Sequence, residues 1–125
     1  MPLAYKIDKE RRLVTTSGWD TIARQDVIDH RQKLAADHDF SPTYATVADF
    51  TRVTKLEITA ADIQLFAAKN VFAPNARRAI VVADREAFGL ARMFEILRDV
   101  RGEEGIRIFD NVEDAREWVQ LPQRT

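Results

Sequence analysis

Two aspartates, Asp49 and Asp84, each follow an apolar segment that is typical of a buried strand. Open α/β sheets bind ligands at the carboxyl ends of their strands, so both carboxylates are candidates for ligand binding or acid–base chemistry. Both also have a structural interpretation. Asp84 can cap the helix that follows it, and Asp49 can hold Phe50 and Thr51 in place through an Asx-type loop bond. The sequence favours the cap for Asp84 and leaves both interpretations of Asp49 open.

The two histidines, His30 and His38, are the side chains best suited to general base catalysis near neutral pH. His30 falls within a predicted helix at the edge of its apolar stripe, which indicates a packing role. His38 lies in the segment Asp37-His38-Asp39, but no second histidine-rich segment is present to complete a metal site. Ser41 is near His38 only in sequence, and the chain has no GxSxG motif. We therefore predict no catalytic residue and no bound metal.

The glycines do not form a nucleotide-binding loop. Loops that cradle phosphate need glycines so that backbone amides can approach the anion. None of Gly18, Gly89, Gly102 and Gly105 follows a predicted strand in the order GxGxxG or GxxxxGK[ST]. We predict no bound cofactor.

Composition and charge limit the class of protein further. A chain of 125 residues with 46% hydrophobic and 31% charged residues is typical of one globular domain. The absence of cysteine excludes disulfides, thiolate nucleophiles and cysteine-ligated zinc. The net charge of −1 comes from basic and acidic residues that alternate along the chain, which argues against nucleic-acid binding. No window approaches the roughly 20 apolar residues that span a bilayer, and the N-terminus lacks the apolar run of a signal peptide, so we expect a cytoplasmic protein.

Hydrophobic spacing predicts alternating strands and helices. Strands are predicted over residues 5–8, 13–16, 44–48, 79–83 and 106–109. Helices are predicted from a cap at Asp20 or Thr21 to about Ala36, from Thr59 to before Pro74, from Asp84 to before Gly102, and from Asp110 onward. Residues 17–19 are expected to break the second strand, and residues 49–59 to form a loop that leads into the cap of the second helix. The order ββαβαβαβα predicts an α/β domain over residues 1–121, with a mostly parallel sheet, an antiparallel first strand and a loose tail at 122–125.

Three of the predicted helices show apolar residues at helical spacing. The first buries Ala23, Val27, His30 or Arg31, and Leu34; the second buries Ile63, Phe66 and Ala67; the third buries Leu90, Met93, Phe94, Leu97 and Val100. In the third helix the apolar residues cover more than one face, with Phe88 and Gly89 beside Leu90. Either this helix packs closely against the sheet, or part of it forms an exposed apolar patch for a partner. Arg92 on the same helix is more typical of a solvated or salt-bridged arginine than of a ligand contact.

The element order and the phrase Val47-Ala48-Asp49-Phe50-Thr51-Arg52-Val53 resemble the STAS domains of anti-sigma-factor antagonists. More closely, nearly the whole domain resembles a small bacterial STAS/SEC14-like family that is largely without assigned activity. The matching pieces are Arg12-Leu13-Val14 with Gly18, Asp39-Phe40, Ala87-Phe88-Gly89-Leu90-Ala91-Arg92-Met93-Phe94, and Ile108-Phe109-Asp110 with Glu113, Ala115 and Trp118.

For the antagonists, the resemblance implies a serine at the start of the second helix that a kinase phosphorylates to switch partner binding. A phosphate is well placed there because the free amides and the helix dipole face it. Here Ile58 occupies the serine position and Ala60 replaces a glycine, so Thr59 is the one candidate phosphoacceptor.

Two functional hypotheses follow. The first is a non-enzymatic regulatory module that binds a protein partner or a second copy of itself, with tentative contacts at Asp49, Thr51, Thr54, Thr59, Asp84 and Arg92. The second, from the SEC14-like side of the resemblance, is a carrier or sensor of a small apolar, lipid-like ligand, held between the sheet and the helices near Phe66, Phe72, Phe88 and Phe94. An empty phenylalanine-lined pocket favours the carrier, and a filled core with an exposed groove beside Thr51 and Thr54 favours the module. An enzyme that uses Asp49 or Asp84 is a third alternative.

Overall fold

The computed structural model describes residues 2–121, and its strands and helices follow the predicted order. The elements are β1 (Leu3–Asp8), β2 (Leu13–Ala23), α1 (Arg24–Ala35), β3 (Ala45–Glu57), α2 (Ala60–Ala68), β4 (Arg78–Val81), α3 (Arg85–Val100), β5 (Ile106–Phe109) and α4 (Val112–Gln120). The predicted α/β class is therefore confirmed. The tail expected at 122–125 lies outside the described residues.

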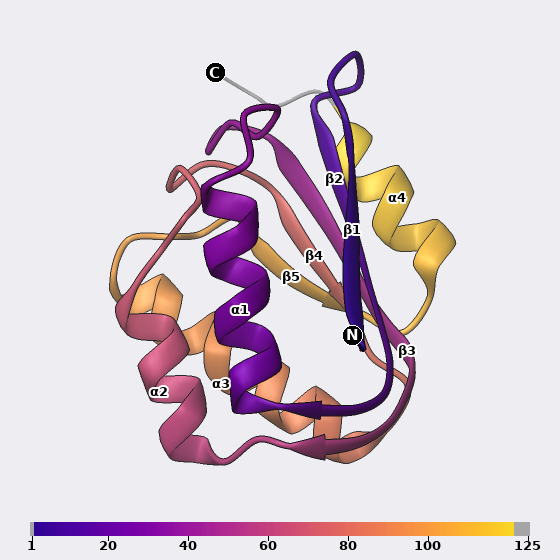
Figure 1. Ribbon diagram of the computed structural model, residues 1–125, viewed down its shortest axis with the longest axis vertical. Coiled ribbons are helices and arrows are strands. Elements are labelled where there is room, and N and C mark those ends of the chain that lie inside the picture. Colours follow the sequence, from indigo (N-terminus) through magenta and orange to yellow (C-terminus); the bar gives the residue numbers. More distant parts are fainter. Residues whose placement is uncertain (1, 122–125) are drawn as a thin grey trace.

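One sheet contains all five strands in the order β1-β2-β3-β4-β5, with β1 antiparallel to β2 and the other pairs parallel. Each parallel connection advances by one strand in the same direction. Crossovers of one hand then place their helices on one face of the sheet, and α1, α2 and α3 do lie together on one side (Figure 1). The last helix, α4, covers the opposite face.

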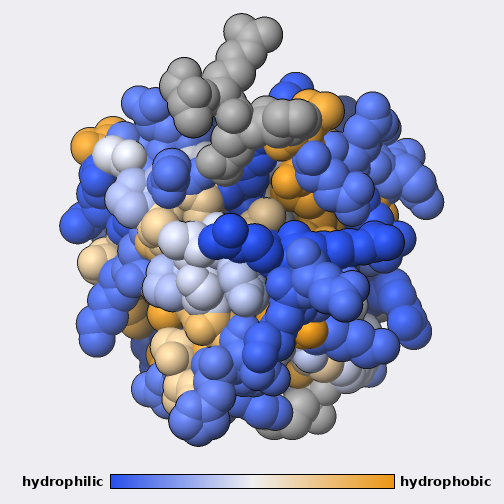
Figure 2. Space-filling model, turned by 90° about the horizontal axis from the view of Figure 1, so that it is seen from above, coloured by the Kyte–Doolittle hydropathy of each residue, from blue (hydrophilic) through white to orange (hydrophobic). Residues whose placement is uncertain are grey.

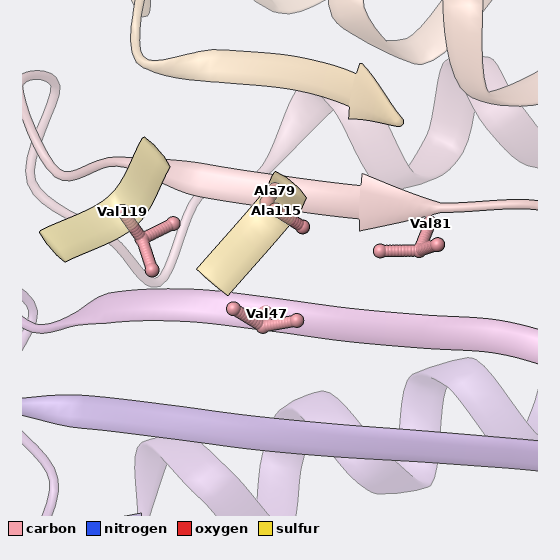
Figure 3. Close-up of a cluster of buried hydrophobic side chains, with 5 residues drawn as sticks. All are labelled: Val47, Ala79, Val81, Ala115 and Val119. Carbon is pink, nitrogen blue, oxygen red and sulfur yellow. The ribbon is translucent and has the colours of Figure 1, made fainter. Parts of the chain in front are cut away.

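The face under α4 is filled by small and β-branched side chains. Val47, Ala79 and Val81 of the sheet contact Ala115 and Val119 of α4, and none of the five is more than 8% exposed. Figure 3 shows Ala115 over Ala79, with Val119 to one side of it on the same helix. This half of the core is closely packed, as protein interiors normally are.

The second strand does not end at residues 17–19, as the sequence predicted, but continues to Ala23. Its pairing with β3 shifts register twice, between Ser17 and Trp19 and between Asp20 and Thr21. Such bulges bend a strand without ending it. Gly18 is required at the first bend because a Cβ there would come within 2.7 Å of the Phe50 ring.

The first helix consequently starts later than expected, since Ala23 and neither Asp20 nor Thr21 occupies the N-cap position. Asp26 stabilises this start, because its carboxylate accepts a hydrogen bond of 2.8 Å from the Ala23 amide.

The predicted loop at 49–59 is mostly strand, because β3 extends through Glu57. Its threonines and valine are β-branched residues that favour extended backbone. Pairing with β4 stops at Asp49, whereas pairing with β2 continues until Glu57 lies opposite Ala23. Residues 19–23 and 52–57 therefore form a two-stranded extension, the β2–β3 ribbon, which curves beneath α1 and α2 (Figure 1).

The capping predictions for α2 and α3 are confirmed. Thr59 accepts a hydrogen bond from the Asp62 amide at 3.2 Å, and Asp62 accepts one from the Thr59 amide at 3.0 Å, which completes a capping box. The Asp84 carboxylate accepts from the Ala87 amide at 2.8 Å. Within residues 2–121, no helix is long and apolar enough to cross a bilayer.

Two boundary predictions and one burial prediction are wrong. The cap of α4 is Asn111, which accepts from the Asp114 amide, and not Asp110. The fourth strand covers 78–81 instead of 79–83. Val100 is 80% exposed, because it lies in the last turn of α3, beyond the part of that helix that packs on the sheet.

A buried cluster of charges joins the end of α3 to β4. Gly102 ends the helix with φ of 93°, and the Glu103 amide then donates to the Arg98 carbonyl at 3.0 Å. This turn brings the Glu103 carboxylate close to Arg98. Glu103 Oε1 accepts a hydrogen bond of 2.8 Å from Arg98 Nε and one of 3.2 Å from Arg78 Nη1. Arg98 Nη1 also donates to the Ala67 carbonyl of α2 at 2.6 Å.

Removing the Glu103 carboxylate should strongly destabilise the protein. Glu103 is 1% exposed and is the ion-pair partner of both arginines. Glu103→Gln should lower the free energy of unfolding by about 3–5 kcal/mol, since it leaves buried charge uncompensated. The exposed neighbour provides a matched control, because Glu104→Gln should change it by no more than about 0.5 kcal/mol. Urea unfolding measures both, and equal effects would contradict the role assigned to Glu103.

Thr59 tolerates a negative charge if its main role is to cap α2. The free energy of unfolding of Thr59→Asp should stay within about 0.5 kcal/mol of the wild type, because aspartate can accept the same hydrogen bond from the Asp62 amide. Thr59→Ala loses this bond, so its free energy of unfolding should fall by about 1 kcal/mol. Thermal and urea unfolding check both values. A loss of several kcal/mol in the aspartate variant would show that the hydroxyl does more than cap the helix.

Candidate ligand-binding site

A cavity of about 260 Å³ lies between the sheet and the helices α1, α2 and α3, on the face opposite α4. Small side chains contribute part of its wall, namely Thr46 and Ala48 of β3 and Ala87 and Ala91 of α3. Since α2 and α3 also pack against each other, the helices do not close over these short side chains. The face under α4 is filled, and this face is hollow.

Most of the cavity wall is apolar. Side chains from the sheet, the β2–β3 ribbon and all three helices contribute, among them Leu34, Phe50, Ile63, Phe66, Phe72 and Phe94. Three of the four phenylalanines expected around such a pocket are therefore in place. The fourth expectation is wrong: Phe88 is 50% exposed on the outer side of α3 and does not line the cavity.

The mouth of the cavity is marked by those lining residues that are exposed to solvent. They are Thr54 and Lys55 on the β2–β3 ribbon, and Asp84 and Glu86 at the start of α3. The mouth thus lies at the carboxyl ends of the parallel strands, where α/β sheets commonly bind ligands. Figure 2 looks onto the opposite end of the molecule, where hydrophilic side chains cover most of the surface in view.

Polar side chains gather at the buried end of the cavity, which we call the polar end (Thr16, Thr46, His30, Arg31 and Arg78). Thr46 and Arg78 are register partners on β3 and β4, so their side chains lie next to each other on the cavity face. Thr46 is 6% exposed, and among residues 2–121 its Oγ1 is the one buried side-chain polar atom without a hydrogen-bond partner. Leaving a buried hydroxyl unpaired is unfavourable, so this atom points to a function.

His30 contributes a neutral imidazole to the polar end. Its Nε2 lies 3.5 Å from Thr16 Oγ1, and its ring packs edge-on against Tyr5 with 5.6 Å between centroids. Burial lowers the pKa of His30, and the nearby charges of Arg31 and Lys33 lower that pKa further. The packing role expected for His30 is consistent with these contacts, and the ring adds no positive charge at neutral pH.

Arg31 contributes a guanidinium that is held by backbone carbonyls. Its Nη1 donates to the Phe66 carbonyl at 2.8 Å and its Nη2 donates to the Lys69 carbonyl. Burial and the positive charge of Arg98 lower the pKa of Arg31. Within residues 2–121, no carboxylate lies at ion-pair distance from this side chain.

Four of the residues proposed from sequence lie on the strands or at the mouth. Asp49 and Thr51 bond to each other, since Asp49 Oδ1 accepts from the Thr51 amide at 2.9 Å and from its hydroxyl at 2.6 Å. This is the local bond expected for Asp49, although it forms in a strand and not in a loop. Thr54 and Asp84 both line the cavity and are exposed to solvent, so they lie at its mouth.

The other two proposed residues lie outside the cavity. Thr59 caps α2, and Arg92 forms an ion pair with Glu95 on the exposed side of α3. His38 is exposed, and the described residues contain no group of three histidine or acidic side chains that could hold a metal.

The sequence does not predict that the charged residues belong to this site, although each of them lies in a recognisable sequence pattern. Arg31 falls in the predicted buried stripe of α1 as an alternative to His30, and Arg78 belongs to one of two basic pairs in the chain. Glu103 lies in a segment whose glycines indicate only the end of a helix. Their pairing across 25 residues of sequence has no periodic signal.

No protein-family model and no curated protein matches the sequence. Among solved structures, the fold is similar to that of an uncharacterized protein of the DUF3478 family with a SpoIIAA-like fold, from Shewanella loihica PV-4. The two chains are 17% identical, with a TM-score of 0.60, and the match covers 94% of this chain and 93% of the other. The chain therefore has the SpoIIAA-like, STAS-like fold that its sequence resemblance implied.

Proposed function

We propose that this protein binds a small apolar ligand in the cavity, as a carrier or a sensor. The observation that carries the proposal is the cavity itself, which has an apolar wall and a mouth at the carboxyl ends of the strands. An apolar cavity of about 150 Å³ is large enough to bind benzene. In proportion, the 260 Å³ found here has room for a ligand of roughly ten non-hydrogen atoms.

The candidate carboxylates support binding over catalysis. An oxygen of Asp49 accepts two hydrogen bonds from Thr51, and an oxygen of Asp84 accepts the capping bond of α3. Each carboxylate thus has a structural partner, and a non-enzymatic role fits these contacts.

The regulatory module with a protein partner, or a second copy of the chain, stays a prediction. An exposed groove beside Thr51 and Thr54 would have favoured that role. Instead, Thr51 is bonded to Asp49, and Thr54 lines the cavity mouth. A sensor combines the two hypotheses, because a ligand at the mouth contacts the β2–β3 ribbon.

Binding of an apolar ligand should raise the thermal stability of the protein. A ligand that binds only the folded state stabilises it by about 2.7 kcal/mol when its free concentration is 100 times its Kd. We expect 1-nonanol to raise the unfolding midpoint in a concentration-dependent manner and to appear as a 1:1 complex in native mass spectrometry.

A cavity-filling variant tests whether binding occurs in this cavity. Ala48→Leu places extra methyl groups in the space beside Thr46 and should abolish the shift caused by 1-nonanol. Ala61→Leu on the exposed side of α2 is the matched control and should retain it. If short-chain and medium-chain alcohols leave the wild type unshifted and uncomplexed, the proposed function is wrong.

A further inference from the structure

We propose that the ligand of this cavity carries a carboxylate, which binds between the guanidinium groups of Arg31 and Arg78 and the hydroxyl of Thr46. This inference depends on the proposed function, since it assigns a headgroup to the ligand of the same cavity. Its apolar chain then extends past Phe50 and Leu90 toward the mouth.

The first argument is the balance of charge. Three guanidinium groups, those of Arg31, Arg78 and Arg98, lie near one another: the charges of Arg31 and Arg98 lower the pKa of Arg78, and the charge of Arg98 lowers the pKa of Arg31. Among residues 2–121, Glu103 is the carboxylate that pairs with this group. Two positive charges are therefore uncompensated at a site that is largely removed from water. Like charges repel strongly where the effective dielectric constant is low, so an anion that enters this site is attracted.

The second argument is the supply of hydrogen-bond donors. Both hydrogen bonds from Arg78 to Glu103 come from Nη1, although a guanidinium has five N–H donors. The Nε and Nη2 groups of Arg78 are left for another acceptor. The ring of Phe72 lies 4.1 Å from the Arg78 guanidinium carbon and that of Phe94 lies 5.5 Å from it, so the two rings fix its position.

The third argument is the buried hydroxyl of Thr46. Thr46 Oγ1 lies beside Arg78 and has no partner within residues 2–121. A threonine hydroxyl can donate one hydrogen bond, and a carboxylate oxygen is a strong acceptor for it. Hydroxyl and guanidinium donors together match a carboxylate, whereas an alcohol would use only part of them and a hydrocarbon none.

The fourth argument is size. A ligand of roughly ten non-hydrogen atoms matches a medium-chain carboxylic acid such as octanoate. In 1-nonanol the same number of non-hydrogen atoms carries no charge, so the two compounds differ mainly in the headgroup.

The test is isothermal titration calorimetry of the full chain at pH 7 with octanoate and with 1-nonanol. We expect octanoate to bind at least about tenfold more tightly, as a charge-assisted hydrogen bond contributes more than a neutral one. Equal or weaker binding of octanoate would overturn this inference and leave the proposed function intact. Binding of neither compound would overturn the proposed function as well.

Two variants locate the headgroup. Thr46→Val replaces the unpaired hydroxyl by a methyl group, so the protein should fold at least as stably, while octanoate should bind about three- to tenfold more weakly. Arg31→Met removes one charge and should weaken octanoate binding by at least about tenfold. Both should still bind 1-nonanol, with a smaller loss of affinity than for octanoate, which shows that the cavity is intact.

Arg92→Met is the control, because Arg92 is an exposed arginine outside the cavity, and it should change neither affinity. If Thr46→Val binds octanoate as tightly as the wild type, the carboxylate does not bind where we propose. That variant decides the matter even if Arg31→Met fails to fold.

Discussion

The buried carboxylate of Glu103 joins the secondary-structure elements on the cavity side of the sheet. It pairs with Arg98 at the end of α3 and with Arg78 on β4, and Arg98 in turn donates to the carbonyl of Ala67 on α2. One strand and two helices therefore meet at a single buried anion. Burying charge is unfavourable unless it is paired and hydrogen-bonded, so these elements have one arrangement in which all three charges are accommodated. That arrangement also places a guanidinium in the wall of the cavity.

The two faces of the sheet are packed differently. Under α4, short side chains such as Val47 and Ala79 meet the equally short Ala115, so helix and sheet approach closely and exclude space. On the other face, short side chains such as Ala48 lie under three helices, and two of these, α2 and α3, are also positioned by their contacts with each other. Close packing is lost there, together with its dispersion energy. A cavity lined by apolar groups is the direct result, and the proposed apolar ligand would restore the missing contacts.

Sequence patterns that act over a few residues predicted this structure well, and longer-range relations did not appear in them. The element order and the Thr59–Asp62 capping box depend on neighbours within one or two turns, and both are confirmed. Ser17-Gly18-Trp19 indicated the end of a strand, but these residues suit a bulge equally well, and the strand continues past them. The partnership of Arg78 with Glu103 requires the fold before it can be recognised. The cavity likewise depends on how far apart the helices stand, which no hydrophobic period encodes.

The β2–β3 ribbon makes one part of the molecule mechanically distinct. Beyond Asp49 the extended chain has a partner on one edge alone, whereas the strands behind it are flanked on both. Two strands by themselves are at best marginally stable in water. Thr54 and Lys55 of this weakly supported pair form one lip of the mouth. That lip is therefore the part of the cavity wall with the least support, whereas the guanidinium groups at the polar end are anchored by hydrogen bonds to backbone carbonyls and to Glu103.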